Sequence, residues 1–265
     1  MGIRKDRPSA PVLVRVKFVL VLLAAATSLS AESQTLRVLC WNLHHGVGLD
    51  GKLDLPRIAK IIQKAKPDLV ALQEVDKNCR RSGKVDQAEE LAKLTGMHAS
   101  FGKAMDFDGG EYGQAILTKK HPQLTKIHRL PGNGEPRIAF EALLSIKNIK
   151  LSFVTAHLDL DAAQRLSQSE TLIKALSGNP NHPLILCGDF NDVPNSPVIQ
   201  AFSKALKPVA KSEPVLTCPA DKPDSEIDHV FIRGLEAVGP VVVLPEAVAS
   251  DHRPLLVEIK LPERN

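Results

Sequence analysis

A carboxylate and an amide follow a short apolar run in the second half of the chain. Residues 184–187 are Leu-Ile-Leu-Cys, and after Gly188 come Asp189 and Asn191, two positions apart. An apolar run that ends at glycine and polar residues is typical of a buried strand that stops at a pocket. Since side chains on an extended segment alternate, we expect Asp189 and Asn191 to face the same side. Such a pair can hold a water, a metal ion or a phosphate.

Polar residues also stand at or beside the ends of other apolar segments. They are Asn42, Glu74, His157, Asp228, Asp251 and His252. Strand ends at one edge of a sheet lie close together, and burying several acids is unfavourable unless a cation or hydrogen bonds compensate. Oxygen ligands suit a hard ion, and Mg2+ usually binds one or two carboxylates together with waters and a substrate phosphate. The set therefore predicts phosphate-ester hydrolysis.

Six short motifs occur in a fixed order. They are Trp-Asn at 41–42, Gln-Glu at 73–74, Thr-Ala-His at 155–157, Gly-Asp-Phe-Asn at 188–191, Ile-Asp at 227–228 and Ser-Asp-His at 250–252. Over about residues 35–260 this order resembles the endonuclease/exonuclease/phosphatase superfamily, which contains exonuclease III-like and deoxyribonuclease-like enzymes. The resemblance implies a four-layered α/β sandwich (α/β/β/α), with two mixed sheets face to face and helices outside. It also implies a Mg2+ or Mn2+ site at one edge.

The resemblance further implies roles for the acids and amides. Glu74 would be the main metal carboxylate, with Asn42 and Asp251 beside it. Asp189 would align or deprotonate the attacking water, and Asn191 would hold a phosphate oxygen.

Two histidines complete the implied machinery as imidazolium donors that meet developing negative charge. His252, oriented by Asp228, would bind the phosphoryl group or carry a proton, and His157 would stabilise the charge of the transition state. Outside the motifs, Tyr112 and Arg137 are candidate substrate-binding residues, because a guanidinium can bind phosphate through two hydrogen bonds. Both are equally compatible with a place on the rim of the site.

Apolar periodicity predicts the elements that position these groups. Helices are expected at residues 54–65, 87–95, 161–177 and 196–206, and strands at 36–43, 68–75, 98–103, 113–118, 137–146, 150–157, 184–187, 227–232, 241–244 and 255–259. The order strand, helix, strand at the start of the chain suggests parallel pairing of the first two strands. The middle strands are expected to form a meander.

The first 31 residues have the pattern of an export signal. Five Lys and Arg precede the apolar run 18–26 and the small residues 27–31, and the apolar run is too short for a membrane span. We expect cleavage near Ala31 and a domain at residues 35–262 that is exported, periplasmic or secreted, with no transmembrane segment in the mature form. An uncleaved N-terminal anchor is the alternative.

Charge and composition bear on the substrate. Residues 1–31 hold five of the 34 Lys and Arg and one of the 30 Asp and Glu, so the remainder carries 29 of each. A domain without net charge lacks the field that drives non-specific nucleic-acid binding, and 4% aromatic residues leave few platforms for stacking bases. We favour a small phosphodiester or phosphomonoester, such as a nucleotide or lipid headgroup, and expect a monomer.

Other functions compete with this prediction. An endo- or exonuclease acting on DNA or RNA is the first alternative, and a non-catalytic binding protein on the same fold is the second. The adjacent Ser250, Asp251 and His252 do not suggest a serine hydrolase, because consecutive residues cannot form the required line and no Gly-x-Ser-x-Gly elbow is present.

The cysteines do not suggest a zinc cluster, since none has a C-x-x-C spacing. Cys40 and Cys187 lie in apolar strand patterns and are expected to be buried. Cys79 and Cys218 lie in polar loops, where export would permit a disulfide, and the sequence leaves that pairing open.

Overall fold

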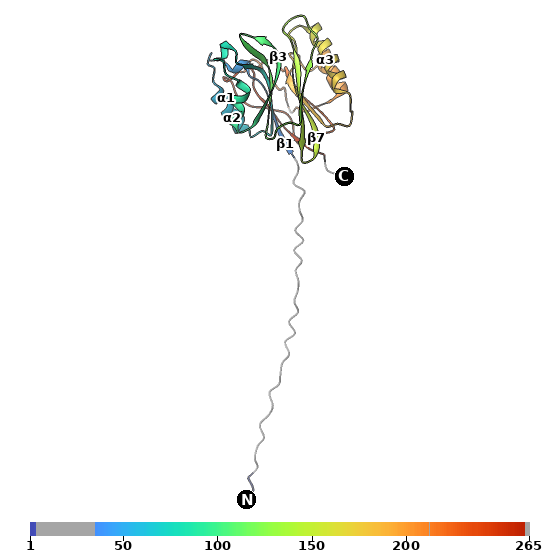
Figure 1. Ribbon diagram of the computed structural model, residues 1–265. Helices are drawn as coiled ribbons and strands as arrows, with labels where there is room; N and C mark the ends of the chain where they lie inside the picture. The colour runs from blue at the N-terminus through green and yellow to red at the C-terminus, as the bar shows by residue number, and fades with distance from the viewer. Residues whose placement is uncertain (4–34, 212, 263–265) are drawn as a thin grey trace. The chain divides into compact units, whose positions relative to one another are not determined.

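Two β-sheets pack face to face in the computed structural model, which describes residues 1–3, 35–211 and 213–262 (Figure 1). The first sheet has the order β11 (Glu236–Ala237), β13 (Leu255–Lys260), β1 (Thr35–Asn42), β2 (Leu69–Lys77), β4 (Gly110–Thr118), β3 (His98–Phe107), and β12 (Val242–Val243) also pairs with β13. The second has the order β5 (Leu124–Arg129), β6 (Ile138–Ile146), β7 (Ile149–His157), β8 (Leu184–Asp189), β10 (Asp228–Arg233), β9 (Lys207–Pro208). The predicted division into a signal at 1–31 and a domain at 35–262 stays a prediction, because residues 4–34 lie outside the described part.

Each sheet contains one parallel pair of strands joined by a helix. In the first sheet β1 pairs in parallel with β2, and α1 (Leu55–Ala65) lies between them in sequence. In the second sheet β7 pairs in parallel with β8 across α3 (Ala162–Leu176). The other strand pairs among the described residues are antiparallel. The carboxyl ends of both parallel pairs are therefore the strand ends at which the polar motifs stand.

The helices begin and end where the sequence predicts. The side chain of Asp54 accepts a hydrogen bond from the Arg57 amide at the start of α1, and Asp86 caps α2 (Gln87–Thr95) in the same way. The left-handed Gly96 ends α2, and Ser196 caps α4 (Pro197–Ala205). These caps satisfy backbone amides that have no partner within a helix. Two short 3-10 helices, η1 (His44–Gly46) and η2 (Arg80–Ser82), follow β1 and β2.

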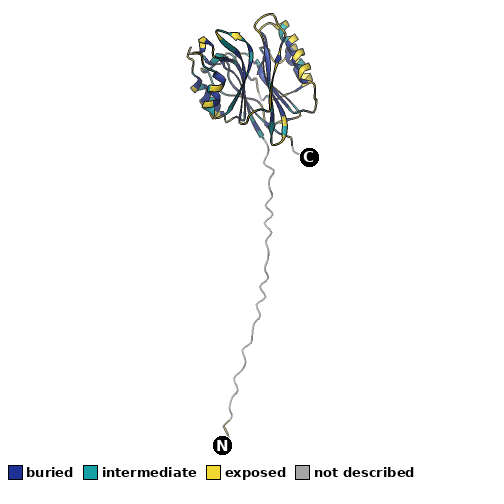
Figure 2. Cartoon of the chain, viewed as in Figure 1, coloured by how far each residue is buried: buried dark blue, intermediate teal, exposed yellow. Residues whose placement is uncertain are grey.

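Within the described part of the chain, three apolar cores separate four layers. Phe140, Phe153 and Val257 belong to a core between the sheets. A second core packs α1 and α2 on the first sheet, and a third packs α3 and α4 on the second, so that helices cover the outer faces (Figure 1). The helices turn exposed faces outward, while the sheets are mostly buried (Figure 2). The predicted α/β/β/α sandwich of two mixed sheets is confirmed.

Some strands differ from the prediction. β5 was not predicted, because four of its first five residues are exposed and its sequence lacks the apolar alternation of a half-buried strand. β3 and β4 extend beyond the predicted segments into a hairpin turn, where polar residues interrupt the apolar pattern from which the strands were predicted.

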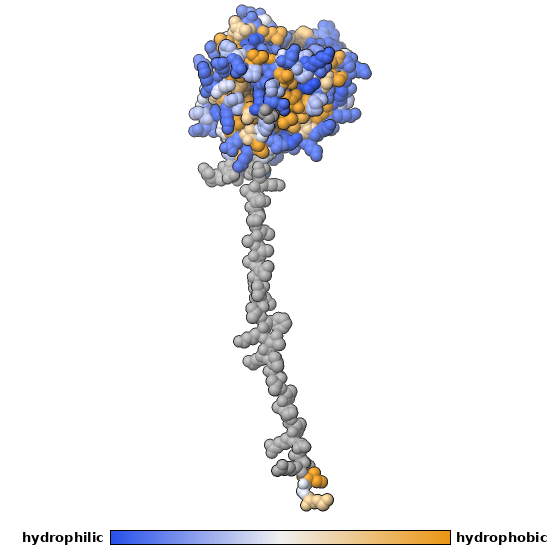
Figure 3. Space-filling view, turned by 180° about the vertical axis from the view of Figure 1, so that it is seen from behind, coloured by the Kyte–Doolittle hydropathy of each residue, from blue (hydrophilic) through white to orange (hydrophobic). Residues whose placement is uncertain are grey.

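The surface shown in Figure 3 is largely hydrophilic with apolar side chains interspersed. Among the described residues, no helix is long and apolar enough to cross a membrane.

Candidate active site

The polar strand ends meet in one pocket of about 420 Å3. Eight of the ten predicted site residues line it: Glu74, Tyr112, Arg137, His157, Asp189, Asn191, Asp251 and His252. The other two, Asn42 and Asp228, are buried and hydrogen-bond residues that line the pocket. The structure thus brings together all the predicted residues, although they come from both sheets.

The residues of the motifs that carry no predicted chemistry bind the motifs to one another. The Trp41 indole N–H donates to the backbone oxygen of His252 at 2.8 Å, and the Ser250 hydroxyl donates to the backbone oxygen of Asn42 at 2.7 Å. Between the sheets, the Gln73 amide donates to the Thr155 hydroxyl at 2.7 Å. These buried contacts fix the loop before β13 against β1 and fix the first sheet against the second.

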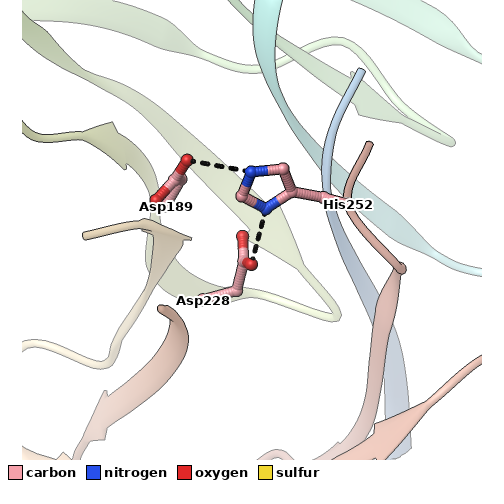
Figure 4. A group of neighbouring side chains, drawn as sticks. All are labelled: Asp189, Asp228 and His252. Carbon is pink, nitrogen blue, oxygen red and sulfur yellow. Dashed lines mark hydrogen bonds and ion pairs between the residues drawn. The ribbon is translucent and has the colours of Figure 1, made fainter. Parts of the chain in front are cut away.

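His252 lies between two buried carboxylates (Figure 4). Its Nδ1 is 2.8 Å from Asp228 Oδ2, and its Nε2 is 3.6 Å from Asp189 Oδ2. Asp228 is held in turn by the Thr217 hydroxyl, which donates to it at 2.5 Å. Burial lowers the pKa of His252, but the charge and hydrogen bond of Asp228, together with a hydrogen bond to Cys218 and the charge of Asp189, outweigh burial and raise this pKa well above its ordinary value. His252 is therefore an imidazolium at neutral pH.

Asp189 is the last residue of β8 and pairs with Asp228 across the antiparallel β8 and β10 strands. It accepts hydrogen bonds from the Asn42 side-chain amide at 3.0 Å and from the Asn191 backbone at 2.9 Å. Burial raises the pKa of Asp189 to about 7; the charge of His252 opposes this rise and that of Asp228 adds to it. A carboxylate with such a pKa is matched to proton transfer near neutral pH.

His157 differs from His252 in its charge. Arg137 Nη1 lies 3.0 and 2.9 Å from its two ring nitrogens, and His157 Nε2 is 3.6 Å from Asp189 Oδ2. Burial, and then the charges of Arg137 and His252, lower the pKa of His157 well below its ordinary value. The expectation of two imidazolium donors is corrected here, because His157 is neutral and offers a ring N–H without a charge.

Asn191 reaches the pocket by a different path than predicted. β8 ends at Asp189, and Asn191 has a left-handed backbone with φ 49°. Its backbone amide donates to the Asp189 side chain, and its side-chain amide donates to the Leu158 backbone oxygen. Asp189 and Asn191 do face one pocket, as expected, but a turn after β8 brings Asn191 there and strand alternation does not. Asparagine tolerates this conformation better than most residues do.

Glu74 and Asp251 form the oxygen-rich part of the pocket. The pairing of β2 with β4 shifts register between Leu72 and Val75, and Glu74 has φ 55°, so a bulge turns its side chain into the pocket. Glu74 accepts a hydrogen bond from the Asn42 amide at 3.0 Å. Burial raises its pKa, and the charge of Asp251 raises it further. Two carboxylates that repel each other beside an amide fit a hard divalent cation.

A second group with metal-binding atoms overlaps the residues predicted to be catalytic. Ligand atoms of Asp189, Asp228 and His252 lie within 4.8 Å of one another. Here His252 already bridges the two carboxylates, so a cation would have to displace its proton. We therefore regard Glu74, Asp251 and Asn42 as the better match to a metal site, whose chemistry calls for oxygen ligands.

Other pocket residues had little signal in the sequence. Arg81, Met105, Phe107, Leu160 and Cys218 line the pocket from loops or strand ends that show no periodicity, and His44 and His45, whose role the sequence left open, line it too. The described cysteines are free. The Cys79 thiol lies 3.3 Å from the Phe107 backbone oxygen, whereas Cys218 borders the pocket, so the disulfide between them that the sequence left open is not formed.

Comparison with known families agrees with this geometry. The model of the Endonuclease/Exonuclease/phosphatase family matches residues 39–252. This chain belongs to that family. Members of the family are phosphoric ester hydrolases.

Individual relatives are more distant. A UPF0294 protein of Vibrio vulnificus is 36% identical over 103 residues, which are 36% of this chain and 33% of that protein, so the chain spans about a third of the curated relatives it matches. The fold is shared with an endonuclease/exonuclease/phosphatase from Beutenbergia cavernae, with a TM-score of 0.69, 23% identity and coverage of 86% and 72% of the two chains. It is also shared with the mannosyl-6-phosphatase of Bacteroides thetaiotaomicron, with a TM-score of 0.70, 21% identity and coverage of 85% and 100%.

Proposed function

We propose that this family member is a divalent-metal-dependent hydrolase of small phosphate monoesters or diesters, acting by direct attack of water. The observation that carries the proposal is the position of His252 between Asp189 and Asp228, at the wall of a pocket that also contains Glu74 and Asp251. One part of this pocket supplies a base and a cationic donor. The other part supplies ligands for a hard ion.

The chain's own residues divide the reaction among them. Asp189 accepts a proton from water as the water oxygen bonds to phosphorus and the bond to the leaving oxygen breaks. The His252 imidazolium offsets the negative charge that grows on the phosphoryl oxygens. The side-chain amide of Asn191 and the neutral ring of His157 donate N–H hydrogen bonds to these oxygens. When bound by Glu74 and Asp251, with Asn42 beside them, Mg2+ or Mn2+ supplies Lewis-acid stabilisation of charge.

The size and charge of the site support a small substrate. A pocket of about 420 Å3 lies in the range of small-molecule sites. Residues 32–265 carry as many acidic as basic side chains, which is unlike a protein that tracks long duplex DNA. The mannosyl-6-phosphatase that shares the fold is named for a small phosphate ester. We further propose that residues 1–31 direct export, with an uncleaved anchor as the alternative, and that the protein acts as a monomer.

A substrate panel tests this function. The purified protein is assayed on p-nitrophenyl phosphate, bis(p-nitrophenyl) phosphate, RNA and supercoiled plasmid, with Mg2+ and with chelator. We expect hydrolysis of a small ester that requires metal and falls by roughly 10²- to 10⁴-fold in kcat for Asp189→Asn and for His252→Ala. Asp106→Asn and His121→Ala, at exposed positions outside the pocket, are matched controls that should keep full activity.

Three outcomes would contradict the proposal. Activity that survives chelator would remove the metal from the reaction, and activity that persists in both catalytic variants would remove Asp189 and His252 from it. Plasmid or RNA cleavage far above every small ester would reverse the substrate preference.

A further inference from the structure

The pocket wall contains an arginine that the proposed chemistry does not use. Arg81, in η2, lines the pocket and binds Asp76 through two parallel hydrogen bonds, Nε to Oδ2 and Nη2 to Oδ1, each 2.8 Å long. The Asp76 side chain is fully buried, whereas that of Arg81 is 32% exposed. A bidentate bond to a buried carboxylate fixes the plane of a guanidinium.

The backbone and the flat face of Arg81 are fixed as well. Its amide donates to Asp108 Oδ2 at 2.6 Å, which ties η2 to the hairpin turn between β3 and β4. The guanidinium carbon lies 4.5 Å from the ring centre of Phe107 and 5.5 Å from that of Tyr112. Both rings also line the pocket. Because the Arg81 side chain has little conformational freedom left to lose, binding an anion to it costs little ordering entropy.

In the part of the chain that the structure describes, one guanidinium nitrogen of Arg81 makes no hydrogen bond. Among the described residues the hydrogen bonds of Arg81 use Nε, Nη2 and the backbone amide, and none uses Nη1. Arg137, the other arginine of the pocket, differs in this respect, since its Nη1 contacts His157 and Glu135. The pocket therefore holds one guanidinium beside the reacting groups and a second, separately supported one on the wall with Phe107.

We propose that Arg81 binds a second anionic group of the substrate through Nη1, so that the preferred substrate is a small phosphate ester that also carries a carboxylate or a second phosphate. This inference rests on the proposed function for the position of the reacting phosphate. Phe107 and Tyr112 then form the apolar surface along which the carbon skeleton between the two anionic groups lies. Arg81 is a specificity residue and takes no part in bond breaking.

Binding of matched ligands tests the proposal. Titration calorimetry with Mg2+, on the slow Asp189→Asn protein, compares glucitol 6-phosphate with 6-phosphogluconate and glycerol 3-phosphate with 3-phosphoglycerate; each pair differs by a terminal hydroxymethyl or carboxylate. Glucitol 1,6-bisphosphate tests a second phosphate. We expect at least tenfold tighter binding of the acid-bearing member in the pair whose length fits. A stronger effect of the bisphosphate than of the carboxylate would assign the second group as phosphate.

Variants separate the role of Arg81 from general folding. Arg81→Gln alone would leave the buried Asp76 charge without a partner, so the test uses Arg81→Gln with Asp76→Asn, and separately Arg81→Lys, which keeps a charge but loses the planar fork. Both should lose the preference for the acid-bearing ligand. Arg80→Gln is the matched control, because Arg80 lies in the same turn, outside the pocket, and pairs with Asp108. It should keep the preference.

The outcomes distinguish this inference from the function it rests on. Equal affinities within both pairs, or a preference that survives Arg81→Gln with Asp76→Asn, would overturn the role of Arg81 even if chromogenic esters are hydrolysed. A preference that depends on Arg81 in a protein that hydrolyses no ester would keep the anion site and refute the proposed hydrolysis.

Discussion

At the scale of single residues, two histidines flank Asp189 and take opposite protonation states. His157 Nε2 and His252 Nε2 are each 3.6 Å from Asp189 Oδ2. The neighbour of His252 is the carboxylate of Asp228, which raises its pKa against burial, whereas His157 is buried beside the guanidinium of Arg137, and both factors lower its pKa. Asp189, the proposed base, thus lies between the His252 imidazolium and the neutral ring of His157.

Gly188 shows how one missing side chain sets the position of Asp189. A Cβ at Gly188 would lie 1.9 Å from the backbone oxygen of Ala156 on β7. Gly188→Ala should therefore push β8 away from β7 and destabilise the fold by about 3 kcal/mol, as overpacked sites do. Urea unfolding measures the loss. Gly239→Ala, where a Cβ meets nothing within 4 Å, is the control, and equal stability of the two variants would contradict the close approach.

At the scale of elements, a polar cluster links three strands away from the pocket. Glu141 on β6 contacts His128 Nε2 of β5 at 2.7 Å and accepts a hydrogen bond from the Ser152 hydroxyl of β7 at 2.5 Å. The bond with His128 lowers the pKa of Glu141; burial opposes this shift, and the bond from Ser152 adds to it. The ionised carboxylate therefore links β5, β6 and β7, of which the sequence predicted only β6 and β7.

This lowered pKa predicts a pH-dependent stability. A carboxyl group whose pKa is lower in the folded state contributes stability above its unfolded pKa of about 4.3, and this contribution is lost as pH falls through the folded pKa. Glu141→Gln should cost roughly 1 to 3 kcal/mol at pH 7 and progressively less below about pH 4. Denaturant unfolding at several pH values measures the difference. Glu170→Gln, exposed on α3, should show no such trend, and a cost at Glu141 that does not change with pH would refute the assignment.

At the scale of the whole molecule, metal binding should be visible as stability. Glu74 and Asp251 repel each other in the metal-free protein, and burial of Glu74 adds to this cost. Mg2+ at a hundred times its Kd should raise the unfolding temperature by about 5 to 10 °C. Glu74→Gln should unfold at the same or a higher temperature than the wild type without metal, because a buried charge is gone, and should lose the shift with Mg2+.

A second acid of the pocket provides the control for this measurement. Glu135 pairs with Arg137 at 3.3 Å and is outside the proposed metal ligands. Glu135→Gln should therefore keep the Mg2+ shift when both proteins are followed by thermal unfolding. A full shift in Glu74→Gln would place the cation elsewhere, and the Asp189, Asp228 and His252 group would become the next candidate.

The sequence by itself predicted the helices, most strands and the ten polar residues that the fold brings together. Helix ends depend on contacts between residues three or four positions apart, such as Asp54 with Arg57, so a short stretch of sequence is enough to predict them. Strand ends depend on apolar runs that stop at polar residues. β5 was missed because an exposed edge strand needs no apolar alternation.

Only the tertiary structure decided how the site residues are charged and which further residues join them. Asn42 and Asp189 are 147 positions apart yet hydrogen-bonded, because the carboxyl ends of two parallel strand pairs face each other across the sandwich. The protonation of His157 and His252 depends on burial and on charges brought by other strands. Arg81 joins the pocket through a loop without periodicity, held by a carboxylate that only the fold buries. Such interactions depend on distance in space, which a linear pattern does not contain.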